Sequence, residues 1–217
     1  MNIYELTLVT PDLSVQRDFY QNVLKLPVTT IDDEHLTVQV GQTKVTFVQG
    51  SIEGVYHFAF NIPENQFAAA LKCLPVPLIS AIDGKTEFFS EEWNAHNFYF
   101  YDAAGNILEL IARHTLANTS DQPFSEKSLL NVSEIGVAVA DVIAFTEGSG
   151  LPYYRSHVDE FAPIGDENGL LIVVKIGREW FPNTGRPALE LPLQVVLSSG
   201  DKQMQIDAMP NAVLHTR

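Results

Sequence analysis

The chain has 217 residues, and 46% of them are hydrophobic, which is enough to bury a substantial core. Its 27 acidic and 13 basic side chains give a net charge of −14, which argues against a nucleic-acid ligand and against docking on an anionic membrane. A single cysteine excludes an intrachain disulfide, and there is no apolar run of the roughly 18 residues that a membrane span needs. We therefore expect a globular cytoplasmic protein without a signal peptide.

Residues 1–50 predict a βαβββ unit. The segment 3–10 has the alternating pattern of a short strand, and Pro11 is typical of a helix start. An amphipathic helix follows and ends before Pro27. Two or three short strands come next, among them 36–40 and 44–48.

The same order of elements returns in residues 55–113. A short strand at 55–62 precedes a helix that Pro63 opens. The strands predicted after this helix are 86–89, 96–101 and 107–112. Glu5 and His57 occupy equivalent places in the two units. The sequence thus predicts tandem modules, which we expect to pair within residues 1–113.

A polar stretch without periodicity, residues 114–130, predicts a linker. A third strand of the same type follows at 131–140, with Glu134 at the place of Glu5 and His57. Residues 131–217 also contain a proline- and glycine-rich insert, so we expect them to form a degenerate third βαβββ-like module. The predicted fold class is α+β, with tandem βαβββ modules forming an incomplete barrel around a cup.

The alternation of side chains along the strands predicts which residues share the concave face of this cup. Large apolar residues occupy every second position in the opening strands and in the last strand of the second module. The other face then carries Glu5, His57 and Glu109. In the hairpin of the last two strands, Tyr99 lies across from Glu109 and shares its face, whereas His96 faces away. We expect Glu5, His57, Glu109 and Tyr99 to line one cavity.

Three stretches of the chain resemble the vicinal oxygen chelate superfamily. They read ELTLVTPDLSVQRDFYQNVLKLPV, HFAF and FYFYDAAGNILEL. This superfamily contains glyoxalases, extradiol ring-cleaving dioxygenases, and bleomycin- and fosfomycin-resistance proteins. The similarity covers residues 1–113 and, loosely, 131–200. Its most specific piece spans Tyr99–Leu110, where Ala103 replaces the usual proline.

The resemblance implies a divalent metal ion. Its ligands would come from the first strand of each module and the last strand of the second, positions that Glu5, His57 and Glu109 hold here. One imidazole and two carboxylates suit Fe²⁺, Mn²⁺, Ni²⁺ or Zn²⁺. Tyr99 stands ten residues before Glu109, like the substrate-side tyrosine of extradiol dioxygenases, although these enzymes have a histidine at the place of Glu5. Glu134 has no visible partner, and we interpret it as a relic of the repeat.

We therefore expect a metal-dependent enzyme of glyoxalase or extradiol-dioxygenase type that acts on a small oxygen-chelating substrate. Under this hypothesis, Tyr99 donates a hydrogen bond to an anionic oxygen of the substrate. The alternative is a non-catalytic small-molecule-binding protein, like the bleomycin-resistance members, that uses the same cup without metal. The third module has no partner module within the chain, so its unpaired strand edges predict a homodimer.

Overall fold

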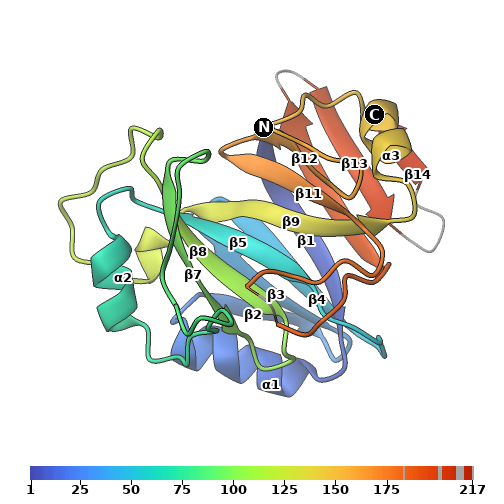
Figure 1. The fold of residues 1–217 in the computed structure, drawn as a ribbon. Helices are drawn as coiled ribbons and strands as arrows, with labels where there is room; N and C mark the ends of the chain where they lie inside the picture. Colours follow the sequence, from blue (N-terminus) through green and yellow to red (C-terminus); the bar gives the residue numbers. More distant parts are fainter. Residues whose placement is uncertain (183, 200–201, 209–212, 217) are drawn as a thin grey trace.

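The computed structural model describes residues 1–182, 184–199, 202–208 and 213–216. These residues form two seven-stranded sheets with short helices at their edges (Figure 1). No helix in the described ranges is long and apolar enough to cross a membrane.

The first sheet joins the N-terminal module to the C-terminal strands, in the order β14-β13-β12-β1-β4-β3-β2. Its elements are β1 (Asn2–Thr10), α1 (Leu13–Asp18, continued by a π-helical turn, Phe19–Val23), β2 (Val28–Asp32), β3 (His35–Val40), β4 (Thr43–Gln49), β12 (Leu193–Ser199), β13 (Lys202–Ala208) and β14 (Val213–Thr216). Helix α1 begins at Leu13 because the carboxylate of Asp12 accepts hydrogen bonds from the backbone N–H groups of Ser14 and Val15.

The second sheet has the strand order β10-β11-β9-β5-β8-β7-β6. Its elements are β5 (His57–Ile62), α2 (Phe67–Cys73), β6 (Phe88–Ser90), β7 (Ala95–Tyr101), β8 (Ile107–Arg113), β9 (Asn131–Val139), α3 (Val142–Ser149), β10 (Phe161–Asp166) and β11 (Gly169–Lys175). A short 3-10 helix, Glu126–Ser128, precedes β9 in the segment that connects it to β8.

The predicted α+β class with incomplete barrels is confirmed, but the modules pair differently from our expectation. The opening strand β5 of the second module lies antiparallel to β9, and β1 lies antiparallel to β12. The modules in residues 1–50 and 55–113 are therefore in different sheets. Residues 131–217 are divided between the two sheets, because β9, β10 and β11 extend the second and β12, β13 and β14 extend the first.

This arrangement removes the reason for which we expected a homodimer. The opening strand β9 pairs with β5, and β12 pairs with β1, so both have partners within one chain. The homodimer remains a prediction, but the unpaired module that motivated it is not found in the part of the chain that the structure describes.

The core lies between the two sheets, which lie one behind the other in Figure 1. Leu6 and Leu8 of β1 belong to the same buried cluster as Phe58 and Phe60 of β5. Helices α1 and α2 add further apolar side chains at its margin. Burial of these apolar faces against each other leaves the opposite face of the second sheet to carry polar side chains.

Candidate metal centre

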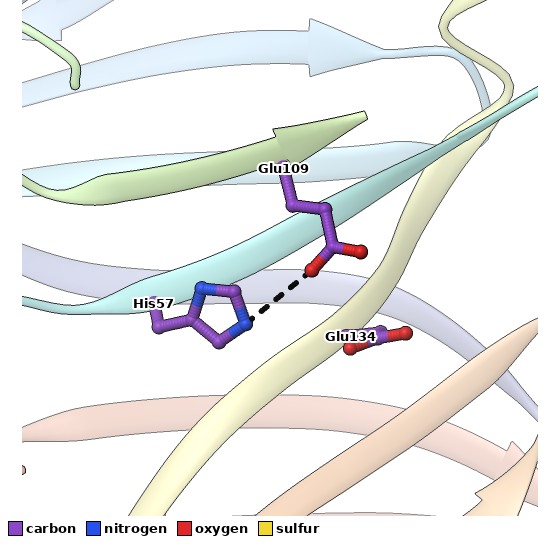
Figure 2. Close-up of side chains that lie close together, drawn as sticks. All are labelled: His57, Glu109 and Glu134. Atoms are coloured by element: carbon purple, nitrogen blue, oxygen red, sulfur yellow. Dashed lines mark ion pairs between the residues drawn. The ribbon is translucent and has the colours of Figure 1, made fainter. Parts of the chain in front are cut away.

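Three buried ionisable side chains meet on that opposite face of the second sheet. His57 comes from β5, Glu109 from β8 and Glu134 from β9, and Figure 2 shows the three side chains close together. One ligand atom from each residue lies within 4.8 Å of the others. The Nε2 atom of His57 is 3.6 Å from the Oε2 atom of Glu109.

Strand register brings the three residues together. Ala59 of β5 pairs with Glu109 on one side and with Glu134 on the other. Both carboxylates therefore flank a side chain that is no larger than a methyl group, and His57 stands two residues away on the same face of β5. The small side chain of Ala59 leaves the space into which the two glutamates and the histidine project.

His57 is held in the tautomer that a metal ligand needs. Its Nδ1 atom lies 3.3 Å from the carbonyl oxygen of Ile107, which can only accept, so Nδ1 carries the proton and Nε2 has a free lone pair. Burial lowers the pKa of His57 to about 4, which keeps the ring neutral at physiological pH. The indole of Trp180 packs on the imidazole, with ring centroids 5.2 Å apart.

The two carboxylates bind protons more tightly than exposed carboxylates do. Burial, and next the charge of Glu134, raises the pKa of Glu109 to about 8, although a hydrogen bond of 2.7 Å from Asn97 Nδ2 to Glu109 Oε1 opposes this shift. Burial also raises the pKa of Glu134, against the attraction of Arg113. Two acidic groups in a dry cluster thus compete for one compensating charge.

That charge belongs to Arg113, which is fully buried. Its guanidinium forms an ion pair with Glu134, and its Nε atom donates a 3.2 Å hydrogen bond to Asn61 Oδ1. The guanidinium also lies 5.3 Å from the ring centroid of Trp93. One arginine therefore faces two buried carboxylates, so the cluster lacks one positive charge whenever both glutamates are ionised.

The cluster lies in the wall of a cavity of about 580 Å³. Aromatic side chains supply much of the lining: Phe88, Phe89, Trp93, Tyr99, Phe161, Trp180 and Phe181. Trp180 and Phe181 belong to the proline- and glycine-rich insert between β11 and β12, which is attached to the turn after β7 by a 2.9 Å hydrogen bond from Arg186 Nη1 to the carbonyl oxygen of Gly105. Gly136 makes room for Trp180, because a Cβ atom at this position would lie 2.4 Å from the indole ring.

Tyr99 lies where the sequence places it. It pairs with Glu109 across the hairpin of β7 and β8, and it lines the cavity. Its hydroxyl oxygen accepts a 2.7 Å hydrogen bond from the same Asn97 amide that contacts Glu109. Burial, followed by the charge of Glu109, raises the pKa of Tyr99 well above its ordinary value. His96 faces away from the cavity, as expected, and its ring contacts Phe67 of α2.

Glu5 does not lie with His57 and Glu109, which corrects our expectation of a shared site. It belongs to β1 in the first sheet, where its side chain is 47% exposed and its Oε1 atom is 2.5 Å from the Nζ atom of Lys44. The reason is the strand pairing, because β1 lies beside β12 and β4 and not beside β5. In the first sheet, the positions equivalent to the three clustered residues hold Glu5, Thr46 and Gln194.

Glu134 takes the place that we gave to Glu5. The sequence did signal it, since Glu134 stands at the same point of an opening strand as His57. Our interpretation of Glu134 as a relic without a partner was wrong, because Glu134 forms an ion pair with Arg113 and lies beside His57 and Glu109. Arg113 and Trp180 carried no comparable sequence signal.

The donor set of the cluster fits a divalent cation. His57 Nε2 has a free lone pair, two carboxylates lie beside it, and Arg113 compensates only one of their charges. A histidine that donates its other ring N–H to a backbone carbonyl is typical of metal sites. His57, Glu109 and Glu134 are therefore the residues that would hold the ion.

Comparison with known proteins supports the fold. No family model matches the sequence, and no curated protein matches it. A solved structure described as a "putative dioxygenase" from Bacillus subtilis covers 99% of this chain and 83% of its own, with a TM-score of 0.63 and 15% identity. Lactoylglutathione lyase from Agrobacterium tumefaciens covers 50% of this chain and 91% of its own, with a TM-score of 0.41 and 17% identity. A fosfomycin resistance protein from Mesorhizobium loti covers 50% and 88%, with a TM-score of 0.37 and 20% identity. The likeness to the Bacillus subtilis structure over nearly the whole chain shows a shared fold.

Proposed function

We propose that this protein is a divalent-metal-dependent enzyme that acts on a small substrate with two neighbouring oxygen atoms. The observation that carries the proposal is the free Nε2 lone pair of His57 beside the carboxylates of Glu109 and Glu134. Three protein ligands leave coordination positions open for a chelating substrate. The ion would polarise the substrate oxygens and favour their anionic form.

The chain's own residues would prepare the site for that substrate. Asn97 orients both the Glu109 carboxylate and the Tyr99 hydroxyl, since one amide group donates to each. Tyr99 would then donate its hydroxyl proton in a hydrogen bond to a substrate anion, because its raised pKa keeps that proton in place. The aromatic walls would exclude water, which strengthens each polar contact inside the cavity. Chemistry of glyoxalase type and of extradiol-dioxygenase type both agree with this arrangement.

A second candidate, a binding protein that works without metal, is favoured by one observation. Arg113 pairs with Glu134, and Asn97 donates to Glu109, so each carboxylate already has a protein partner. In that case the cluster would be a structural polar network under a ligand-binding cup.

Metal analysis distinguishes these two candidates. Protein purified without chelators should contain close to one equivalent of Fe, Mn, Ni or Zn, and calorimetric titration of chelator-treated protein should show one site. His57→Ala should abolish this site. Glu5→Ala is the matched control and should retain it, since Glu5 lies in the other sheet. Wild-type protein that binds none of the four ions would refute the metal proposal and favour the binding protein.

A further inference from the structure

The cavity also contains a cation that the proposed metal chemistry does not use. We propose that the cavity binds a fused-ring aromatic carboxylate, with its carboxylate on the guanidinium of Arg178 and its rings between the aromatic walls. This inference deepens the proposed function and rests on it in one respect only. A metal ion held by His57, Glu109 and Glu134 would meet the end of the ligand opposite its carboxylate. The binding itself needs no metal.

Arg178 is a half-buried arginine with unused hydrogen-bonding capacity. It lines the cavity, and its guanidinium lies 4.9 Å from the ring centroid of Phe161. Within the part of the chain that the structure describes, this guanidinium forms no side-chain hydrogen bond and no ion pair. Burial lowers the pKa of Arg178, against the attraction of Glu160. A guanidinium has five N–H donors in a planar fork that matches a carboxylate, so a carboxylate is the group that Arg178 is suited to bind.

The neighbouring charges leave Arg178 as the cation available to a ligand. Lys85 also lines the cavity, but it is exposed and pairs with Asp83 at 3.0 Å. The Oε1 atom of Glu160 is 3.5 Å from the Nζ atom of Lys175, and this ion pair reduces the attraction of Glu160 for Arg178. Glu87 lies in the lining as well and disfavours an anion near it. Because the whole chain carries a net charge of −14, an anion would bind here only through a local, partly desolvated contact.

Strand geometry separates Arg178 from the carboxylate cluster and so sets the size of the ligand. Phe161, which Arg178 covers, pairs with Val174, and Val174 pairs with Ala138. Ala138 is four residues along β9 from Glu134, which corresponds to about 13 Å at roughly 3.3 Å per residue. Two interstrand steps of about 4.8 Å each, from β10 over β11 to β9, add to this separation. We therefore infer that a fused two-ring system suits the span better than a single ring.

The walls between these two ends favour flat aromatic rings. Tyr99, Phe88 and Phe181 pack edge to face with centroids 4.9–5.7 Å apart, and the Trp180 indole continues this surface toward His57. Trp93 and Phe161 also contribute to the lining. Aromatic side chains bind planar rings with additional stabilisation beyond the apolar area that they bury.

Calorimetric titration of chelator-treated protein tests the proposal independently of any metal. The probes are 2-naphthoate and its neutral isostere 2-naphthamide. We expect the wild type to bind the carboxylate at least tenfold more tightly than the carboxamide. Arg178→Met should weaken naphthoate binding at least tenfold and change naphthamide binding less than about twofold, while Arg178→Lys should retain part of the preference. Lys127→Met is the matched control, because it removes one positive charge from the 3-10 helix before β9, outside the cavity lining.

Three outcomes would overturn the proposal. The first is an equal affinity of the wild type for both probes. The second is an equal loss of affinity for naphthoate and naphthamide in Arg178→Met, and the third is no binding of either probe at millimolar concentration. Each can occur whether or not the protein binds a metal, and a failure of the metal analysis would leave the naphthoate preference unaffected. The two proposals are thus refuted by different results.

Discussion

Replacing Glu109 with glutamine should stabilise the metal-free protein at high pH. The pKa of Glu109 rises from 4.5 to about 8 in the folded protein. The folded state therefore binds this proton more tightly than the unfolded chain, and the free energy of unfolding falls as the pH rises from about 4.5 to about 8. A difference of this size corresponds to at most about 5 kcal/mol, and we expect an observed gain of about 2–5 kcal/mol above pH 8.

Glutamine preserves the shape of the side chain and removes its charge. Its oxygen can still accept from Asn97, and its amide can donate to the Nε2 atom of His57, which lies 3.6 Å from the glutamate oxygen in the wild type. The assay is urea unfolding with EDTA at pH 5, 7 and 9, followed by tryptophan fluorescence. The stability gain should vanish near pH 5 and be largest at pH 9.

The control for this experiment is Glu5→Gln. Glu5 is half exposed and pairs with Lys44 at the surface, so its replacement should change stability by less than about 1 kcal/mol. A Glu109→Gln variant that is less stable than the wild type at pH 9 would refute the reasoning that buried negative charge dominates this site. The same variant should also lose metal affinity, so a gain in stability and a loss of binding are expected together.

Three further substitutions test the surroundings of the site. Tyr99→Phe should weaken turnover or ligand affinity by about 1–3 kcal/mol, measured by calorimetry with an anionic ligand, and an unchanged affinity would exclude a role for its hydroxyl. Arg113→Leu should cost about 3–5 kcal/mol of unfolding free energy in metal-free protein at pH 7, because it leaves Glu134 buried without a partner, and adding Glu134→Leu should restore part of that loss. Gly136→Ala should displace the Trp180 indole and destabilise the protein by about 1–3 kcal/mol, with a shifted fluorescence spectrum; an unchanged spectrum would contradict the close contact.

The sequence predicted those features that depend on local alternation and on short hairpins. Tyr99 and Glu109 face the same side because one hairpin sets their register, and His57 shares that side because β5 lies next to β8 within the same module. These contacts involve neighbouring elements of one module, so the parity of side chains along each strand was sufficient to predict them.

Pairing between modules could not be predicted in this way, since all the opening strands share one pattern. The burial of each strand in the structure shows what distinguishes them. In β1, Glu5 and Thr7 alternate with buried leucines, and this face of the first sheet is half exposed. In β9, by contrast, nearly every residue is buried, as in β5. A strand buried on both faces belongs at the centre of a covered sheet, which favours β9 as the partner of β5.

The remaining parts of the site came from distant segments without a repeated pattern. Trp180 reaches His57 from the insert between β11 and β12, and its position depends on the absence of a side chain at Gly136. Arg113 ends a strand whose other side chains are apolar or belong to the cup. No periodicity marks these residues, and only the three-dimensional arrangement brings them to the cluster.

A crystal structure of the protein grown with Mn²⁺, with diffraction data collected to record the anomalous signal, tests the central claim most directly. We predict an anomalous difference peak bounded by His57 Nε2 and by carboxylate oxygens of Glu109 and Glu134, with none at Glu5. Absence of a peak among these three side chains, while Arg113 and Asn97 keep their contacts with the two glutamates, would contradict the metal centre.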